Sequence, residues 1–194
     1  MQLVAKDADT LSDGSSTAAT SWISMELLTK LHRMNPTYVS GNENTGSIGG
    51  WEKSELRAYL ASTIKPLLPE NIQSKIKAVQ KTCITMDAAL QKSEATVSDE
   101  LWIPSAREIC LDINRIKTEQ EKNGPRYGSV FSSYDAVVKY YGGHGNFYYL
   151  RTVYDEKCYY SGSPSIDHNN AYIEVNPTQM GSDYWPRIAL GFCI

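Results

Sequence analysis

Tyrosine is concentrated in the second part of this chain, and this feature restricts the fold most. Eleven of the thirteen tyrosines lie between Tyr127 and Tyr184, interleaved with Asn, Ser, Asp, Gly and His. Such mixtures are typical of binding loops, because tyrosine supplies rigid contact area at low entropic cost and small polar residues supply adaptable hydrogen bonds. We therefore expect an ordered, loop-rich binding surface here. The alternative is an ordinary β-rich end whose tyrosines are half-buried.

Short apolar runs in the chain predict strands. Residues 149–151, 172–175 and 188–192 have this pattern within the tyrosine-rich part, and residues 2–6 and 101–103 have it earlier. The strands of the second half are separated by long polar stretches. We therefore expect short β-strands and hairpins joined by long loops in that half.

The first half has helical patterns. Residues 51–60 place apolar side chains on one face, and a second helix is expected to open at Pro69 and to include Val79 in its apolar stripe. Residues 80–100 are less regular. Because helices come first and strands later, the order predicts an α+β fold rather than alternating βαβ units.

Ser105 and Glu108 have the spacing of a capping box. In this motif a serine at the helix start and an acidic residue three positions later each bond the other's backbone N–H. The spacing predicts a short helix at 106–112.

The length and composition of the chain favour a single domain that spans residues 1–194. Hydrophobic residues make up 41% of the chain, which is enough for a sizeable core. The net charge is −3 and there is no basic run, so nucleic acid is not an expected partner. The chain shows no signal-peptide pattern and no apolar run of transmembrane length, so membrane insertion is not expected. A virion or a cell surface is the suspected location.

The residue types that usually carry catalysis or metals show no matching pattern. The four cysteines are widely scattered, and none of the three histidines lies at metal-ligand spacing from a cysteine. Buried thiols are favoured at Cys110 and Cys193, and the sequence leaves a disulfide open. No phosphate-binding loop or Gly-x-Ser-x-Gly turn is present. We therefore expect no metal, no cofactor and no catalysis.

Several motifs occur together and carry a resemblance to a known family. They lie at 7–14, 49–60, 101–108, 149–152 and 188–194, and the Gly-Gly-Trp-x-x-Ser-x-x-Arg helix and the Leu-Trp-Ile-Pro-Ser turn are the most specific of them. In this order they resemble an uncharacterised domain family that is common in gut bacteria and their phages. The resemblance covers nearly the whole chain.

That family is similar to C-type lectin-like proteins that diversity-generating retroelements vary. The resemblance implies a C-type lectin-like fold with two main helices in the first half and twisted β-hairpins in the second. It also implies that residues 146–187 form a variable ligand-binding segment, whereas Leu150, Arg151, Val175 and residues 189–192 form the scaffold. The composition of the segment is compatible, since Asn, Tyr, Ser, Asp, His, Thr and Ile are all reachable from an adenine-rich asparagine codon.

The function expected from these observations is recognition of a protein or glycan on a cell surface, without catalysis. The candidate ligand-binding residues are Tyr149, Tyr154, Asp155, Tyr159, Tyr160, Asp167, His168, Asn169, Asn170, Tyr172, Asp183, Tyr184, Trp185 and Arg187. Calcium-dependent sugar binding is not expected, because the calcium motifs of animal lectins are absent.

Two alternatives stay open. The aromatic tract could pack against a neighbouring subunit of a structural phage or surface module, including a second copy of this chain in a homo-oligomer. The chain could also be an enzyme of the formylglycine-generating type, for which Cys158 and Cys193 are the only candidate reactive pair.

Overall fold

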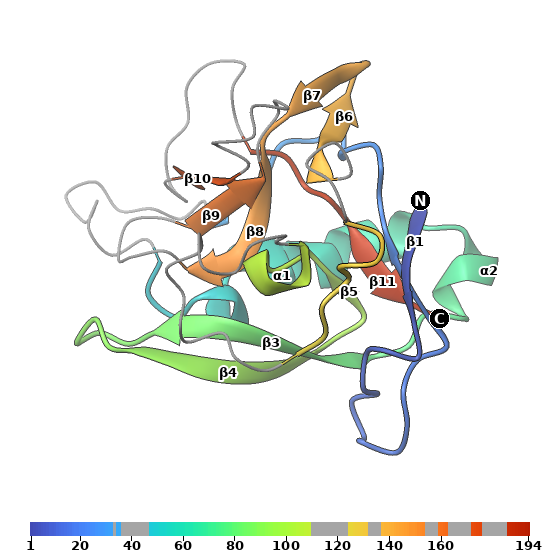
Figure 1. Cartoon of the computed structure of the whole chain (residues 1–194), viewed down its shortest axis with the longest axis horizontal. Coiled ribbons are helices and arrows are strands. Elements are labelled where there is room, and N and C mark those ends of the chain that lie inside the picture. The colour runs from blue at the N-terminus through green and yellow to red at the C-terminus, as the bar shows by residue number, and fades with distance from the viewer. Residues whose placement is uncertain are drawn as a thin grey trace.

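Strands from both ends of the chain lie in one antiparallel sheet (Figure 1). In this computed structural model, β1 (Gln2–Lys6) pairs with β2 (Thr20–Ile23), β2 pairs with β11 (Gly191–Cys193), and β11 pairs with β5 (Leu101–Trp102). The first and last strands of the chain, β1 and β11, therefore flank β2 in the same sheet. The expected strands at 2–6 and 101–103 are also present.

The structure describes most of the chain. The described residues are 1–32, 34–35, 47–109, 124–131, 137–153, 159–162, 172–175 and 186–194, and for 159–162 and 172–175 the description is limited to the backbone.

The longest strands form a hairpin that the sequence patterns do not predict. β3 (Val79–Met86) pairs with β4 (Lys92–Asp99) along its whole length. The Asp87 carboxylate fixes the turn by accepting the backbone N–H groups of Ala89 and Gln91, each at 2.9 Å. Residues 80–100 look irregular in sequence because β3 buries polar residues, and this breaks the apolar alternation that identifies a strand.

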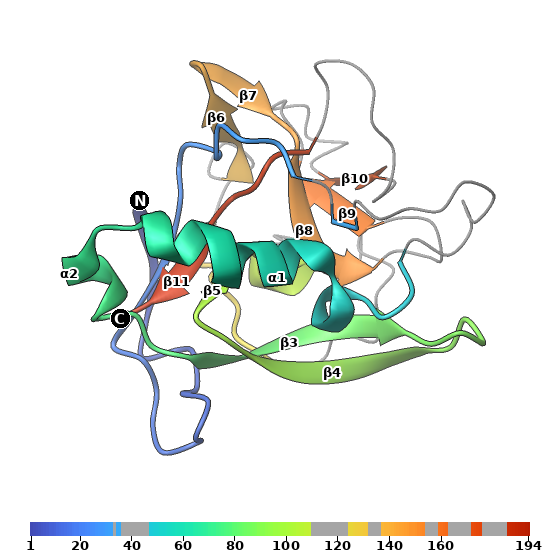
Figure 2. The same cartoon turned by 180° about the vertical axis from the view of Figure 1, so that it is seen from behind.

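One helical run crosses the molecule above this hairpin (Figure 2). It follows the short turn η1 (Trp51–Lys53) and consists of α1 (Glu55–Tyr59), η2 (Leu60–Ile64) and η3 (Lys65–Leu67). The Ser54 side chain caps α1 by accepting the backbone N–H of Arg57 at 3.2 Å. The helix expected at 51–60 is therefore present and extends further.

The second expected helix is wrong. α2 is limited to Glu70–Gln73, and Val79, which was assigned to the apolar stripe of this helix, is the first residue of β3. A proline at the start favours a first turn but does not extend it, and the pairing of β3 with β4 takes the following residues into a sheet.

The expected α+β, C-type lectin-like arrangement with two main helices is therefore also wrong. Most of the regular structure in the described residues is strand, and the only helix of appreciable length there is the run from Glu55 to Leu67. The sequence patterns overestimated helix because they missed the β3–β4 hairpin.

The remaining elements lie in the second half of the chain. α3 (Ala106–Ile109) is the short helix expected after Ser105. The strands there are β6 (Lys139–Tyr141), β7 (His144–Asn146), β8 (Tyr148–Val153), β9 (Tyr159–Gly162) and β10 (Tyr172–Val175). β6 and β7 form a projecting hairpin, and β8, β9 and β10 form a three-stranded antiparallel sheet (Figure 1).

The Gly-Gly-Trp-x-x-Ser-x-x-Arg motif joins the helical run to the hairpin. Gly50 has φ 53°, and a Cβ at this position would lie 2.7 Å from the carbonyl oxygen of Ile84 in β3. The Trp51 indole N–H and the Arg57 Nε–H both donate to the Asp99 carboxylate, at 2.7 and 2.6 Å. The motif therefore has a structural explanation that involves no ligand.

Gly191 is a position at which a methyl group should be strongly destabilising. A Cβ there would lie 2.3 Å from the ring of Trp102, its cross-strand partner, which is fully buried. We expect Gly191→Ala to lower the free energy of unfolding by about 1–3 kcal/mol, since overpacking a core forces backbone or ring shifts. The matched control is Gly128→Ala, because a Cβ there meets no atom within 4 Å. Urea unfolding of both variants measures the effect, and equal stabilities would contradict this account.

Candidate functional site

The tyrosine-rich segment, residues 154–186, follows one end of β8 and returns beside the other end of the same strand. Before the segment, β8 consists entirely of buried residues. After it, Arg187 bridges Tyr148 of β8: the Arg187 N–H donates to the carbonyl of Phe147 at 2.7 Å, and the Tyr149 N–H donates to the carbonyl of Arg187 at 3.0 Å. Because β8 is buried, the variable segment expected at 146–187 is reduced to residues 154–186, which start and end on one part of the molecule. We call this part, β8 with residues 187–193, the frame.

Two strands inside the segment extend the sheet of the frame. β9 pairs with both β8 and β10, and the register places Tyr159 opposite Val153 on one side and Val175 on the other. Tyr160 is paired with Glu174, and Tyr172 with Gly162. Three candidate residues, Tyr159, Tyr160 and Tyr172, therefore have backbone positions in one sheet.

Two other candidates lie in the fully described part of the chain, and only one is accessible. Tyr149 is 0% exposed and lies in the core, so it cannot supply a binding surface. The sequence predicts that Tyr149 lies at the surface, because it is a tyrosine in a polar stretch. This prediction is wrong, because β8 is buried on both faces. Arg187 is half-buried, its guanidinium lies 3.3 Å from the ring centroid of Tyr141, and it donates to the carbonyl of Thr29 at 2.9 Å.

The other candidate residues lie outside the described part of the chain. They are Tyr154, Asp155, Asp167, His168, Asn169, Asn170, Asp183, Tyr184 and Trp185.

Beneath the frame lies a buried cluster of charged residues that sequence patterns did not identify as a unit. The Arg151 guanidinium makes two bonds of 2.7 Å to the carboxylate of Glu108 and also donates to the carbonyls of Thr82 at 2.9 Å and Ile103 at 2.6 Å. Such a two-pronged pair is among the strongest polar contacts in proteins. It ties β8 to α3, to β3 and to the end of β5.

Lys81 is the second cation of this cluster. Its Nζ lies 2.5 Å from Asp9 and 3.0 Å from Glu108, donates to the Tyr127 hydroxyl at 2.8 Å, and lies 3.5 Å from the centroid of the Trp102 ring. All of these residues are buried. We call Asp9, Lys81, Glu108, Tyr127 and Arg151 the ionic cluster. Its two carboxylates balance its two cations.

The ionic cluster shifts the acidity of its members. Burial opposes ionisation of Glu108, but Arg151 and Lys81 outweigh it and lower the pKa of this carboxyl to about 2. Burial, followed by the charges of Glu108 and Asp9, raises the pKa of Tyr127 well above its ordinary value. Glu108 is therefore an anion and Tyr127 a neutral hydroxyl near neutral pH.

The capping box found in the sequence contributes to the same cluster. The Ser105 N–H donates to Glu108 Oε2 at 2.9 Å, and the Glu108 N–H donates to the Ser105 hydroxyl at 3.2 Å. The prediction of a helix start at Ser105 is confirmed. Lys81 gave no comparable signal, because a lysine in an irregular stretch is indistinguishable from a surface residue.

Cys193 lies beside the ionic cluster and is fully buried. Its Sγ is 3.6 Å from Asp9, and burial together with the Asp9 charge raises its pKa to about 12. A thiol is a nucleophile mainly as the thiolate, and the raised pKa disfavours that form of Cys193 near neutral pH. Cys83 and Cys193 are buried and not joined in a disulfide, as was expected for Cys193, whereas Cys110 and Cys158 lie outside the described residues.

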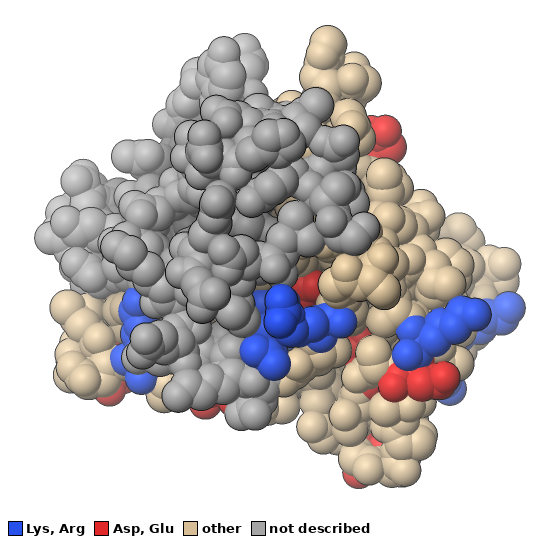
Figure 3. All heavy atoms as spheres, viewed as in Figure 1, with Lys and Arg blue, Asp and Glu red and all other residues tan. Residues whose placement is uncertain are grey.

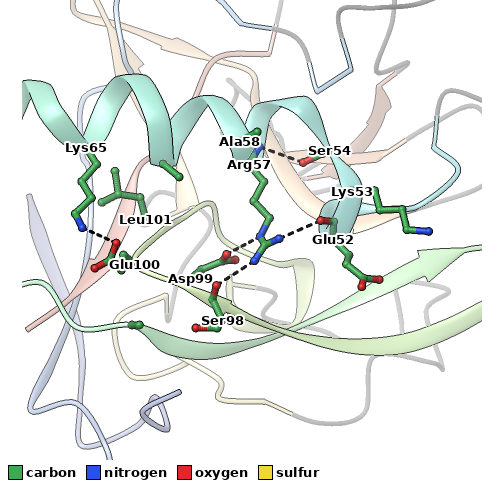
Figure 4. A pocket seen from close by; sticks show the side chains of 12 residues that line it. Glu52, Lys53, Ser54, Arg57, Ala58, Lys65, Ser98, Asp99, Glu100 and Leu101 are labelled. Atoms are coloured by element: carbon green, nitrogen blue, oxygen red, sulfur yellow. Dashed lines mark hydrogen bonds and ion pairs between the residues drawn. The ribbon is translucent and has the colours of Figure 1, made fainter. Parts of the chain in front are cut away.

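A shallow groove of about 500 Å³ lies between the helical run and the end of β4 (Figure 4). Four of the charged side chains that line it are paired: Arg57 with Asp99 at 2.6 Å and Lys65 with Glu100 at 2.5 Å. Because these pairs join the helix to the hairpin, the groove is a structural junction. In Figure 3, the basic and acidic side chains on the described part of this face form a few small groups and no large charged patch.

Metal and membrane sites have no support in the described residues. No group of three or more His, Cys, Asp or Glu there could hold a metal ion. No helix in the described part of the chain has the length and apolarity needed to cross a membrane.

These features define a mainly β domain whose buried ionic cluster fixes a frame for a tyrosine-rich segment. Residues 24–187 match the family described as a domain of unknown function, DUF6273, and the chain belongs to this family. The expectation of an uncharacterised family is thereby confirmed, while the family description mentions neither phages, gut bacteria nor lectins. No curated protein and no solved structure matches the chain.

Acid should destabilise the domain through Glu108. Its pKa is about 2 in the folded state against an ordinary value of 4.5, so its ion pairs contribute fully above pH 4.5 and are lost as the pH falls toward 2. We expect Glu108→Gln to lower stability at pH 7 by about 3–5 kcal/mol, because it removes the buried anion that Arg151 and Lys81 share. Urea unfolding from pH 7 to 2 should show a flatter profile for this variant. The control is Asp13→Asn, which alters an exposed carboxylate; an equally large effect there would contradict the prediction.

The buried charge of Lys139 should lower the stability of the domain at neutral pH, whereas the charge of Glu108 raises it. Its Nζ is buried and has Gln2 Oε1 at 3.2 Å as its polar partner, and burial lowers its pKa from 10.5 to about 8. Between these values the unfolded chain binds more protons than the folded one, so stability should rise with pH from 8 to 10.5. Lys139→Met should be more stable than the parent at pH 7 and lose this rise, measured by urea unfolding. Lys6→Met, at an exposed site, should keep it.

Proposed function

We propose that the domain is a non-catalytic recognition protein that presents residues 154–185 to a protein or glycan on a cell surface. The observation that carries this proposal is that both ends of the segment are attached to the buried strand β8: the segment follows Val153, and Arg187 pairs with Tyr148 at the other end of the strand. A frame that is fixed by contacts outside the segment leaves the segment free to change in sequence without loss of the fold. Its composition, rich in Tyr, Asn, Ser and Asp, suits contact with a ligand.

Diversification of this segment by a retroelement is part of the proposal. Its support is compositional: the residue types of the segment are reachable from adenine-rich codons by changes at adenine. The buried frame adds a physical reason, since Leu150 and Phe192 are core residues that tolerate little change. We further propose that the domain acts at a virion or bacterial surface, where a variable ligand would be met.

Two features of the buried groups favour binding over catalysis. Cys193 is held as a neutral thiol, and the ionic cluster is enclosed among buried residues. Tyr159, Tyr160, Tyr184 and Trp185 are the proposed anchors, because a few aromatic residues carry most of the energy in such interfaces.

Natural variation tests this function directly. Deep sequencing of the gene across a natural population should find substitutions confined to adenine-containing codons of residues 154–185, with Leu150, Gly191 and Phe192 unchanged. An even spread of substitutions over the chain would remove the case for diversification.

A segment exchange tests recognition itself. When residues 154–185 are exchanged between two natural variants that label different bacterial cells in flow cytometry, cell preference should follow the segment. Alanine at each proposed anchor should weaken labelling, by about 2 kcal/mol or more for the strongest. The control is alanine at Lys6, an exposed residue distant in sequence from the segment. Preference that stays with the frame would contradict the proposal.

A further inference from the structure

The Asp9 carboxylate in the ionic cluster has two differently used oxygens. Oδ1 faces the Lys81 amine at 2.5 Å. Oδ2 accepts hydrogen bonds from the Tyr127 hydroxyl at 2.7 Å and from the Ser21 hydroxyl. One oxygen is therefore set against a nucleophile, and the other lies between two hydroxyl donors.

From this arrangement we propose that Lys81 and Asp9 condense into an intramolecular isopeptide bond, with Glu108 as the group that transfers the proton. The Lys81 Nζ forms a bond to Cγ of Asp9, the Cγ–Oδ1 bond breaks, and Oδ1 leaves as water. An ammonium and a carboxylate become an amide and one water molecule. Atoms and charge balance without an oxidant, a reductant or a further reactant.

Glu108 is placed to move the proton. Its Oε1 lies 3.0 Å from Lys81 Nζ, and its ionised form can accept a proton from the ammonium. The free amine then attacks Cγ, and the carboxyl delivers this proton to Oδ1. It then carries a second proton from the newly bonded nitrogen to Oδ1, so that Oδ1 leaves as water and the amide nitrogen keeps one hydrogen. Arg151 and the Ser105 N–H hold Glu108 in this position throughout.

The two hydroxyl groups on Oδ2 stabilise the intermediate. Attack on Cγ places negative charge on Oδ2, and Tyr127 and Ser21 already donate to that atom. Donors aimed in advance at developing charge lower a barrier most effectively where water is excluded. Lys81, Asp9 and Glu108 have side chains 0–1% exposed, and the Trp102 ring covers the amine.

The product is suited to this interior better than the reactants are. Condensation removes one buried cation and one buried anion, which are expensive to desolvate, and leaves Glu108 paired with Arg151. The amide oxygen keeps the two hydroxyl donors, and the amide N–H can donate to Glu108. Every polar atom of the new bond thus has a partner already in place.

The bond would join segments 72 residues apart in the chain. Asp9 follows β1, and Lys81 lies in β3, so the cross-link would tie the terminal sheet to the long hairpin. It would persist in denaturant, unlike the ion pair it replaces. This inference does not depend on the proposed function of residues 154–185.

Intact mass spectrometry of the denatured full chain tests the proposal. We expect a mass below the sequence mass by one water. Trypsin digestion then locates the bond: residues 7–30 and 78–92 should be recovered as one linked species with Lys81 uncleaved. The full sequence mass with normal cleavage after Lys81 would overturn the proposal and leave an ion pair only. Water loss that maps to another residue would overturn it equally.

A variant tests the role of Glu108. Glu108→Gln keeps the shape of the side chain but cannot accept the proton, so the folded variant should have its full sequence mass and free cleavage after Lys81. Circular dichroism establishes that it is folded. A fully linked variant would overturn the assignment of Glu108. If the variant does not fold, the peptide map of the unmodified chain still decides whether the bond exists, and binding by residues 154–185 is measured independently.

Discussion

The contact between Arg151 and Glu108 holds together parts of the chain that are otherwise separate. A single guanidinium reaches the carboxylate of α3, a carbonyl of β3 and the carbonyl of Ile103 after β5. Because these groups are buried, their loss would leave unpaired charges and carbonyls in the core, which is far more destabilising than the loss of a surface pair. The orientation of β8 follows from this contact, and with it the point at which the tyrosine-rich segment begins.

The motifs that carried the family resemblance make the contacts that hold the buried scaffold together. Trp51 of the Gly-Gly-Trp motif donates to Asp99, the capping box positions Glu108, and Arg151 pairs with Glu108 in the ionic cluster. The contacts within the domain explain the presence of each motif, and none of them involves a ligand. The motifs behind the resemblance therefore belong to the buried scaffold, and the functional proposal depends on residues 154–185, which lie outside these motifs.

Local signals in the sequence predicted the structure wherever neighbouring residues decide it. The first strand, the start of the helix at Trp51 and the capping box at Ser105 depend on residues within a few positions of each other. The β3–β4 hairpin and the interior place of Tyr149 were missed because both depend on distant partners. A buried lysine such as Lys81 is stable only when carboxylates from elsewhere in the chain meet it, and no local pattern records that. Of the candidate binding residues, Tyr149 is the one that the fold moves into the core; most of the others lie outside the described residues.

The attachment of both ends of residues 154–186 to β8 also bears on chain length. The distance that this segment must close is fixed by the length of β8, because the segment follows Val153 and Arg187 is bonded beside Tyr148. For a flexible loop the closure entropy grows only with the logarithm of length, at about 0.6 kcal/mol for each doubling. Relatives with insertions or deletions between β9 and β10, or between β10 and Arg187, could therefore keep the same frame. The frame can therefore carry segments with different numbers of residues, and the length of the segment can vary as readily as its sequence.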